Sequence, residues 1–188
     1  MSREEELHGA PDIAAGARPH DSRLTTHDSI DPDNFRRLAG RFATGVAIVT
    51  TLDADGRPTG MTANSFASVS LEPPLVSVAI DHAATILPAL LAATGFTVNI
   101  LEAQQEALSR RFAEGLPERF DGVGWRRGAD DAVVLDGTLA HLRCEKWAEV
   151  AAGDHTIFIG RVTGGESADH GRPLLHYRGG YADWDLQS

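Results

Sequence analysis

Residues 60–70, GMTANSFASVS, place amide and hydroxyl side chains in a stretch whose flanks have strand character. Thr62, Asn64 and Ser65 offer hydrogen-bond donors and acceptors close together in the chain. The pyrimidine edge of a flavin ring carries several acceptors and one N–H donor, so these side chains and the backbone around them can match both kinds. The same residues would also suit a polar hairpin open to water, and this run alone leaves both interpretations open.

Two further stretches carry groups that could act on a ligand. In AGDHTIFIG, the Gly153-Asp154 turn presents His155 at the head of an apolar strand, close to solvent. In DHAATILPAL, a helix start would offer free backbone N–H groups and the Thr85 hydroxyl to a phosphate. A lone histidine at a strand start is more often structural, and any helix start has free N–H groups, so neither stretch is specific by itself.

Several catalytic signatures are absent from the sequence. It contains no G-x-S-x-G, H-E-x-x-H or G-x-x-x-x-G-K-[ST] pattern and no cysteine pair, which removes the main support for hydrolase and zinc chemistry. His141 and Cys144 lie three residues apart on a predicted strand and would face opposite sides, so no metal site is expected. GVGWRRG lacks the glycine spacing of a dinucleotide fingerprint and is predicted to be a loop.

The charge and cysteine content restrict the partners and the compartment. Lys and Arg total 17 against 27 Asp and Glu, a net charge of −10, which disfavours a nucleic-acid partner because phosphate neutralisation requires clustered cations. Cys144 is the sole cysteine, so no internal disulfide can form and the cytoplasm is the expected location. No stretch approaches the ~18 apolar residues of a membrane span, and residues 1–20 lack a signal-peptide pattern, so neither a membrane nor secretion is expected.

The elements that would position these groups begin after residue 30. Residues 1–30 are polar, interrupted by Gly and Pro, and poor in large apolar side chains, which predicts a disordered tail ahead of a single domain over 31–188. Asp31-Pro32 predicts the N-cap and the first position of a helix. The apolar spacing that follows supports this helix, at Phe35, Leu38, Ala39 and Phe42.

Strands dominate the remainder, with helices inserted singly. Residues 45–52 and 59–70 predict a hairpin around the turn DADGRP, and regular alternation would place Ser68 and Ser70 on one face and Val69 on the other. Further strands are predicted at 73–80 and 95–101, in GTLAHLRCEKWAEV and HTIFIGRVTGGESA, and at PLLHYRG, with helices at 83–93 and 102–112. This order lacks repeated βαβ units and predicts a mainly β fold, an antiparallel barrel with added helices.

Six stretches, taken together and in this order, resemble the flavin reductase family of two-component monooxygenase systems: FATGVAIVTT, GMTANSFASVSLEPPLVSVAI, FTVNIL, LSRRFA, GDHTIFIGRV and PLLHYRGGY. The resemblance covers about residues 33–182. It implies an FMN-binding split β-barrel of the Greek-key type, a homodimer, and the reduction of FMN or FAD by NADH or NADPH. It also implies an oxygenase partner that receives the reduced flavin.

The resemblance also implies roles for individual residues. The isoalloxazine ring would be bound by Thr62, Ala63, Asn64, Ser65 and Phe66, with Ser68, Val69 and Ser70 nearby. The ribityl phosphate would meet Ala83, Ala84 and Thr85, the flavin or nucleotide tail would meet Arg111 and Phe112, and the nicotinamide would meet His155, with Tyr181 in the same pocket. The phosphate stretch DHAAT lacks the lysines of some relatives, so Arg110 or Arg111 is expected to neutralise the phosphate.

Two other functions fit the same stretches. One is a split-barrel flavoprotein oxidoreductase that keeps its flavin bound while it oxidises a small substrate. The other is a flavin-binding carrier or redox sensor without reductase activity. Hydride transfer to a flavin depends on stacking at about 3–3.5 Å more than on an acid or a base, so a flavin reductase is expected to lack a catalytic triad.

Overall fold

The computed structural model describes residues 30–182, and residues 1–29 of the predicted tail lie outside them. Contacts divide the chain into two units, Met1–Arg36 and Arg37–Ser188, and the described strands all belong to the second. Helix α1, Pro32–Ala39, begins as expected. The Asp31 carboxylate accepts a hydrogen bond from the Asn34 backbone N–H at 3.0 Å, which confirms the N-cap ahead of Pro32.

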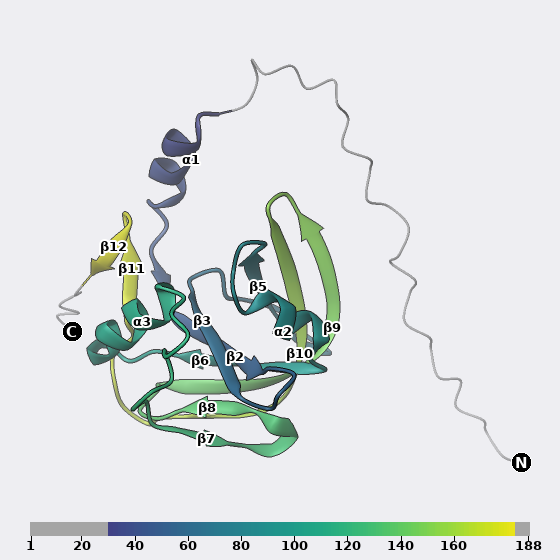
Figure 1. Ribbon diagram of the computed structural model, residues 1–188. Coiled ribbons are helices and arrows are strands. Elements are labelled where there is room, and N and C mark those ends of the chain that lie inside the picture. Colours follow the sequence, from purple (N-terminus) through teal and green to yellow (C-terminus); the bar gives the residue numbers. More distant parts are fainter. Residues whose placement is uncertain (1–29, 183–188) are drawn as a thin grey trace, which may run out of the picture. The chain divides into compact units, whose positions relative to one another are not determined.

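Seven strands form the main sheet, in the order β3-β2-β6-β9-β10-β5-β4 (Figure 1). Their bounds are β2 Ala47–Leu52, β3 Pro58–Ala63, β4 Ala67–Leu71, β5 Pro74–Asp81, β6 Gly95–Ile100, β9 Ala140–Ala152 and β10 His155–Ser167. Neighbouring strands in this order are antiparallel. The fold is therefore mainly β with antiparallel sheets, as predicted.

The two edge strands of this sheet are neighbours along the chain. β3 ends at Ala63 and β4 begins at Ala67, yet they lie at opposite edges of the sheet. A flat sheet of seven strands, spaced about 4.8 Å apart, would hold its edges about 29 Å apart, whereas the link over 64–66 reaches at most about 14 Å. The sheet must therefore curl until its edges approach each other, and the opening between these edges lies at residues 64–66.

The predicted hairpin forms, but its second arm is shorter than expected. β2 pairs with β3, with Ala47 opposite Ala63, and Gly56 at φ 73° closes the turn in a conformation that glycine adopts without steric cost. Residues 67–71 instead form β4, which pairs with β5. The prediction of one strand over 59–70 is therefore wrong, because the curled sheet requires the chain to change its partner at 64–66.

β4 contains an irregularity at Val69 that changes the direction of its serines. Ser68 lies opposite Val76 and Ser70 lies opposite Leu75, two consecutive residues of β5. Because consecutive residues of a strand point to opposite faces, Ser68 and Ser70 do so as well. The prediction that the two serines share a face is wrong, since the extra residue of a β-bulge shifts the alternation by one.

The remaining strands form a long hairpin and two small sheets. β9 and β10 confirm the two long strands that the sequence predicts, and Gly153 at φ 64° closes the turn ahead of His155. β1 Thr44–Gly45, β11 Leu175–Tyr177 and β12 Gly180–Ala182 form one small sheet, and β7 Trp125–Arg127 pairs with β8 Val133–Leu135 in the other. The prediction that GVGWRRG is a loop is wrong for residues 125–127, because pairing with the buried β8 orders them.

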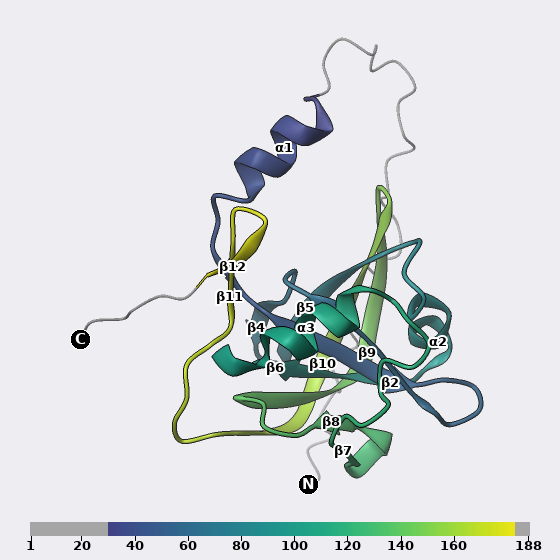
Figure 2. The same ribbon diagram turned by 60° about the vertical axis from the view of Figure 1, so that its left-hand side comes forward.

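Helices lie singly between the strands. α2 spans Leu87–Ala92, α3 spans Glu106–Ala113, and two 3-10 turns, η1 and η2, span Ala103–Gln105 and Ala129–Asp131. α2 is shorter than the predicted 83–93, because Asp81 takes the N–H groups of Ala83 and Ala84 and holds 82–86 in a turn. α3 packs on β3, and the β11–β12 hairpin stands beside α3 (Figures 1 and 2).

Two apolar clusters fill the interior of the second unit. One is built on β5, β6 and β10, and its buried members include Val78, Val98 and Phe158. The other includes Leu101, Phe112 and Leu135. Cys144 belongs to the first cluster, and burial raises the pKa of its thiol to about 12, so the thiolate is scarce at neutral pH.

Residues 30–182 contain neither a membrane-spanning helix nor a cluster of metal ligands. In this range, none of the helices combines the length and the apolar character needed to cross a membrane. The same residues hold no group of three His, Cys, Asp or Glu side chains placed to bind a metal ion. His141 lies opposite Asn99 and Cys144 lies opposite Phe96 on β6, so the two side chains have different neighbours.

Candidate functional site

Strand β5 brings three of the predicted stretches together. The Ser65 hydroxyl donates to the Ala79 carbonyl and accepts from the Ala79 N–H, both at 3.0 Å, so a side chain extends the pairing of β4 with β5. β5 ends at Asp81, where the turn 82–86 begins, and Asp81 lies opposite His155 of β10. Residues 64–66, residues 82–86 and His155 therefore lie around the carboxyl end of one strand.

A second group of contacts gathers beside residues 64–66. The exposed Asn64 donates from Nδ2 to Nδ1 of His176 at 3.3 Å, and the Thr62 hydroxyl donates to the Ser109 carbonyl at 2.6 Å. The hydroxyls of Ser109 and Tyr181 share a hydrogen bond of 2.7 Å. The rings of His176 and Tyr181 pack edge to face with their centroids 6.0 Å apart. β3, α3 and the β11–β12 hairpin thus meet at this point.

The turn 82–86 offers fewer backbone groups than a free helix start would. Asp81 Oδ1 accepts from the Ala83 N–H at 2.7 Å, and the Asp81 carbonyl accepts from the Ala84 N–H at 3.0 Å. The expectation that these N–H groups are free is therefore wrong. The exposed Thr85 hydroxyl accepts a hydrogen bond from Nη2 of Arg119 at 2.8 Å, and a hydroxyl that accepts one bond keeps its own proton for another.

Arg119 is a residue of this region that the sequence did not single out. It is 6% exposed, and Nε donates to the Leu116 carbonyl at 2.8 Å while Nη1 donates to the Gly60 carbonyl. Burial lowers the pKa of its guanidinium. Nothing in GLPERFDG marks this arginine as buried, because two of its three partners, Thr85 and Gly60, lie 34 and 59 residues away in the sequence.

His155 is half-buried and is held by its neighbour in the chain. Its Nδ1 donates to Asp154 Oδ1 at 2.7 Å, and this hydrogen bond lowers the pKa of the Asp154 carboxyl. The adjacent Thr156 hydroxyl is hydrogen-bonded to Nε2 of His82 at 3.1 Å, which ties the start of β10 to the turn after β5. With Nδ1 engaged, Nε2 is the ring nitrogen of His155 that a ligand can reach.

Arg111 and Phe112 each make contacts that stabilise the fold. Nη2 of Arg111 donates to the carbonyls of Glu118 and Asp121 at 2.6 and 2.7 Å, so this side chain fastens the segment that follows α3. Phe112 is 1% exposed and packs edge to face against Phe120, with ring centroids 4.9 Å apart. These contacts lie in the segment after α3 and in the second core cluster, and none of them is made with Asn64 or His155.

The other predicted residues take different places around the opening of the sheet. Arg110 is paired with Glu106 at 2.7 Å and lies 4.7 Å from the centroid of the Tyr181 ring, so it already has a partner carboxylate. Ala63 is buried, and Phe66 packs on the first core cluster. The three residues of β4 lie at the sheet edge, with the first two exposed and the last partly buried: Ser68, Val69 and Ser70.

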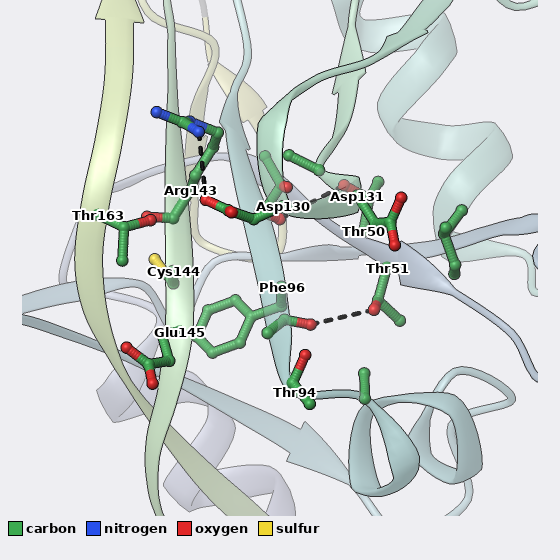
Figure 3. A pocket seen from close by; sticks show the side chains of 15 residues that line it. Thr50, Thr51, Thr94, Phe96, Asp130, Asp131, Arg143, Cys144, Glu145 and Thr163 are labelled. Atoms are coloured by element: carbon green, nitrogen blue, oxygen red, sulfur yellow. Dashed lines mark hydrogen bonds and ion pairs between the residues drawn. The ribbon is translucent and has the colours of Figure 1, made fainter.

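A cavity of about 400 Å³ lies away from these residues, among β2, β6, β9, β10 and η2 (Figure 3). Its lining includes none of the residues that the sequence predicted for the site. Figure 3 shows Arg143 paired with Asp130 on its wall, a contact of 3.4 Å. Asp131 and Glu145 add further carboxylates, which would repel a flavin phosphate. The groups around β5 suit a phosphorylated flavin better than this cavity does.

Known proteins are similar to this chain in sequence and in fold. The chain matches the family model of the flavin reductase like domain over residues 39–185. It is 41% identical over 156 residues to the "Probable flavin reductase" of Rhizobium meliloti, which covers 83% of this chain and 50% of that protein. It is 39% identical over 154 residues to the "Flavin-dependent monooxygenase, reductase subunit HsaB" of Rhodococcus jostii, which covers 82% of this chain and 78% of that protein.

A solved structure extends the likeness to three dimensions. The NADH:FAD oxidoreductase SgcE6 of Streptomyces globisporus, in complex with NAD and FAD fragments, has a TM-score of 0.79 and 37% identity, over 86% of this chain and 99% of that one. The chain thus spans half of the Rhizobium protein and nearly all of the Streptomyces one. The matches run through the strands that gather the predicted stretches around β5. The chain belongs to the flavin reductase family.

Proposed function

We propose that this chain reduces FMN or FAD with a reduced nicotinamide nucleotide, NADH or NADPH. The observation that carries the proposal is the grouping of an exposed amide, an exposed hydroxyl and a histidine with an available ring nitrogen around the carboxyl end of β5. These groups come from Asn64, Thr85 and His155, which are far apart in the sequence. The name of the Streptomyces relative, an NADH:FAD oxidoreductase, supports the same reaction.

The residues present fit a flavin and a nucleotide. The Asn64 amide and the backbone of 64–66, which lies outside both edge strands, supply donors and acceptors for the edge of the ring. The Thr85 hydroxyl supplies a donor for the phosphate. When bound, the flavin accepts a hydride from the nicotinamide. The role of the protein is to hold the two rings in contact and in register, which is the main requirement of this transfer.

Anaerobic mixing with NADH and NADPH tests the reaction. Purified protein with an excess of FMN or FAD should bleach the visible absorbance of the whole flavin pool, at a rate proportional to protein concentration. Flavin that remains bound through purification and is reduced only in an amount equal to the protein would favour a flavoprotein that retains its cofactor. Flavin that stays oxidised with both nucleotides would contradict the proposal and favour a carrier or a redox sensor.

Replacing Asn64 with alanine should weaken flavin binding while the fold is retained. The exposed amide makes one described contact, to His176, so its loss leaves no buried group without a partner. A hydrogen bond contributes roughly 0.5–1.5 kcal/mol, so affinity should fall about threefold to tenfold. Flavin titration measures the change, with Gln104→Ala as a control that removes another exposed amide. An unchanged dissociation constant for Asn64→Ala would remove this residue from the site.

Replacing His155 with alanine should impair the use of the nucleotide more than the binding of flavin. Because Nδ1 donates to Asp154, Nε2 is the nitrogen left for the nucleotide, and without a proton it can accept from the N–H of the nicotinamide carboxamide. A positioning hydrogen bond of roughly 1–3 kcal/mol corresponds to a loss of about fivefold to a hundredfold in kcat/KM. Steady-state turnover with NADH and NADPH, beside a flavin titration, measures both quantities.

Two further variants sharpen this test. His155→Gln keeps an acceptor on a side chain of similar length and should recover part of the loss. His170→Ala removes an exposed histidine that lies outside the strands and should leave kcat/KM unchanged. A shift in the flavin titration alone would show that His155 belongs beside the flavin, and no effect of His155→Ala would make this residue purely structural.

The proposal includes a second copy of the chain and an oxygenase partner in the cytoplasm. Two strands of the sheet each carry two exposed large apolar side chains, and contiguous surfaces of this kind commonly mark protein interfaces: Val69 and Leu71 on β4, and Trp147 and Val150 on β9. The Rhodococcus relative is named as the reductase subunit of a monooxygenase, which supports the oxygenase partner. Light scattering at the mass of a single 20.1 kDa chain would contradict the homodimer.

A further inference from the structure

We propose that Arg119, buried beneath Thr85, is the counter-charge for the phosphate of the flavin, and that these two residues form the phosphate site of the chain. The inference rests on the proposed function, since it names the residues that receive the phosphate of the flavin substrate. It replaces the expectation that Arg110 or Arg111 neutralises this group. The chemical class of the ligand is a phosphate ester, either the monoester of FMN or the diphosphate of FAD.

The first argument is the charge of Arg119 itself. The residue is 6% exposed, and its three hydrogen bonds all go to uncharged oxygens, two carbonyls and one hydroxyl. Over residues 30–182, no carboxylate forms an ion pair with this guanidinium. Charged side chains are rarely buried without an opposite charge, because the loss of hydration is costly. An anion bound at the surface above Arg119 would supply the missing partner.

The second argument is the position of Thr85 between this charge and solvent. Thr85 is exposed, and its Oγ1 accepts from Nη2 of Arg119 at 2.8 Å. With one lone pair used in this way, the hydroxyl proton points elsewhere and can be donated to a phosphate oxygen. The guanidinium charge thus lies one side chain below the surface, in the turn that follows β5.

The neighbouring charges show why the site needs this cation. Asp81 and Asp154 are exposed carboxylates at the same end of β5, and both oppose the binding of an anion. His82 also lies in the turn, and its Nε2 is hydrogen-bonded to Thr156. The two arginines of α3 are engaged elsewhere, Arg110 with Glu106 and Arg111 with two loop carbonyls. Arg119 is the cation in this region whose hydrogen bond leads directly to the turn.

Arg119 also touches the strand that carries the residues for the ring edge. Nη1 donates to the carbonyl of Gly60, two residues before Thr62 in β3, and Nε donates to the carbonyl of Leu116. If Arg119 acts only through these two contacts, replacing it should change the affinity for every flavin equally, with or without a phosphate. If it binds the phosphate, replacing it should change the affinity for the phosphorylated flavins alone. This difference separates the two roles in one experiment.

The test compares the dissociation constants of riboflavin, FMN and FAD for the full chain and four variants. Arg119→Gln should raise the dissociation constants of FMN and FAD by about tenfold to a hundredfold, because hydrogen bonds to charged groups are stronger than neutral ones. The dissociation constant of riboflavin should change by less than about twofold. Thr85→Val should show the same selectivity with a loss of about threefold to tenfold. Arg119→Lys should recover part of the FMN affinity. Arg57→Gln, an exposed arginine of the β2–β3 turn, should change none of the three constants.

Salt provides a second readout of the same charge. FMN affinity of the unaltered chain should fall as NaCl is raised, and it should fall less steeply for Arg119→Gln, since a screened attraction has been removed. Riboflavin affinity should be insensitive to salt in both proteins. A structural role for Arg119 would leave the two salt dependences for FMN equal.

Each other result counts against the proposal. Equal losses for riboflavin and FMN, or no loss at all, would overturn the phosphate role of Arg119. If Arg119→Gln fails to fold, Thr85→Val decides alone, because it leaves the buried arginine in place, and an equal effect on riboflavin and FMN would overturn the proposal. Equal affinity of the unaltered chain for these two flavins would overturn this inference while the proposed function stands. Failure to bind any flavin would overturn both.

Discussion

Phe112→Ala is expected to lower the free energy of unfolding by about 3–5 kcal/mol, the range typical of removing a buried phenylalanine from a core. The ring is 1% exposed and packs edge to face against Phe120. It also lies so close to β3 that a Cβ on Gly60 would come within 3.1 Å of it. Urea denaturation followed by circular dichroism measures the loss.

The same variant decides whether Phe112 belongs to the core or to the binding site. The fraction of the variant that remains folded should bind FMN within about threefold of the unaltered chain, because Phe112 is buried in the second core cluster. Phe112→Leu, which keeps most of the volume, should cost less than about 1.5 kcal/mol. Full stability of Phe112→Ala together with a clear loss of FMN affinity would restore the role that the family resemblance implies.

Asn99→Ala is expected to cost about 2–4 kcal/mol of stability, through hydrogen bonds rather than through packing. Asn99 is fully buried; its Nδ2 donates to the Ile48 carbonyl at 3.2 Å and to the Thr50 hydroxyl at 3.0 Å, and its Oδ1 accepts from the Leu135 N–H at 2.9 Å. Alanine would leave the Leu135 N–H buried without a partner, at a cost of about 1–3 kcal/mol, and would add a cavity. The same denaturation experiment measures the change.

Asn64→Ala is the matched control for Asn99→Ala. Both variants remove an amide, but Asn64 is exposed and its loss leaves no buried group without a partner. The stability of Asn64→Ala should therefore change by less than about 0.5 kcal/mol. The two variants should therefore have different effects: Asn99→Ala should lower stability, and Asn64→Ala should lower flavin affinity. Equal stability of the two variants would show that the contacts of Asn99 with β2 and β8 contribute little to the fold.

Most strands were predictable because apolar alternation and turn chemistry are local. The turns at Gly56 and Gly153 each carry an Asp-Gly or Gly-Asp pair, and a hairpin forms at each, although the second arm of the first is shorter than predicted. The errors lie where a partner distant in the sequence decides the structure. Residues 59–70 change partner at the sheet opening, and residues 125–127 become a strand only because β8 pairs with them.

The residues of the site also divide into those that local sequence predicts and those that depend on distant partners. Asn64, Thr85 and His155 could be singled out because each stands next to a turn or at the start of an element. His176 and Arg119 could not, since their contacts bridge 112 and 34 residues and no local pattern reports them. The N–H groups of residues 83 and 84 are not free as predicted, because the side chain and the carbonyl of Asp81 each accept one of them.

The distance along the chain between Asn64 and His176 has a consequence for the order in which the protein folds. Contacts that close long loops cost more entropy than local ones, so the site, which requires β3, β5, β10, α3 and β11 together, is completed only when nearly all of the sheet is in place. A ligand held there recognises the native state and not the earlier species. Flavin should therefore retard unfolding by mass action and leave the rate of folding unchanged.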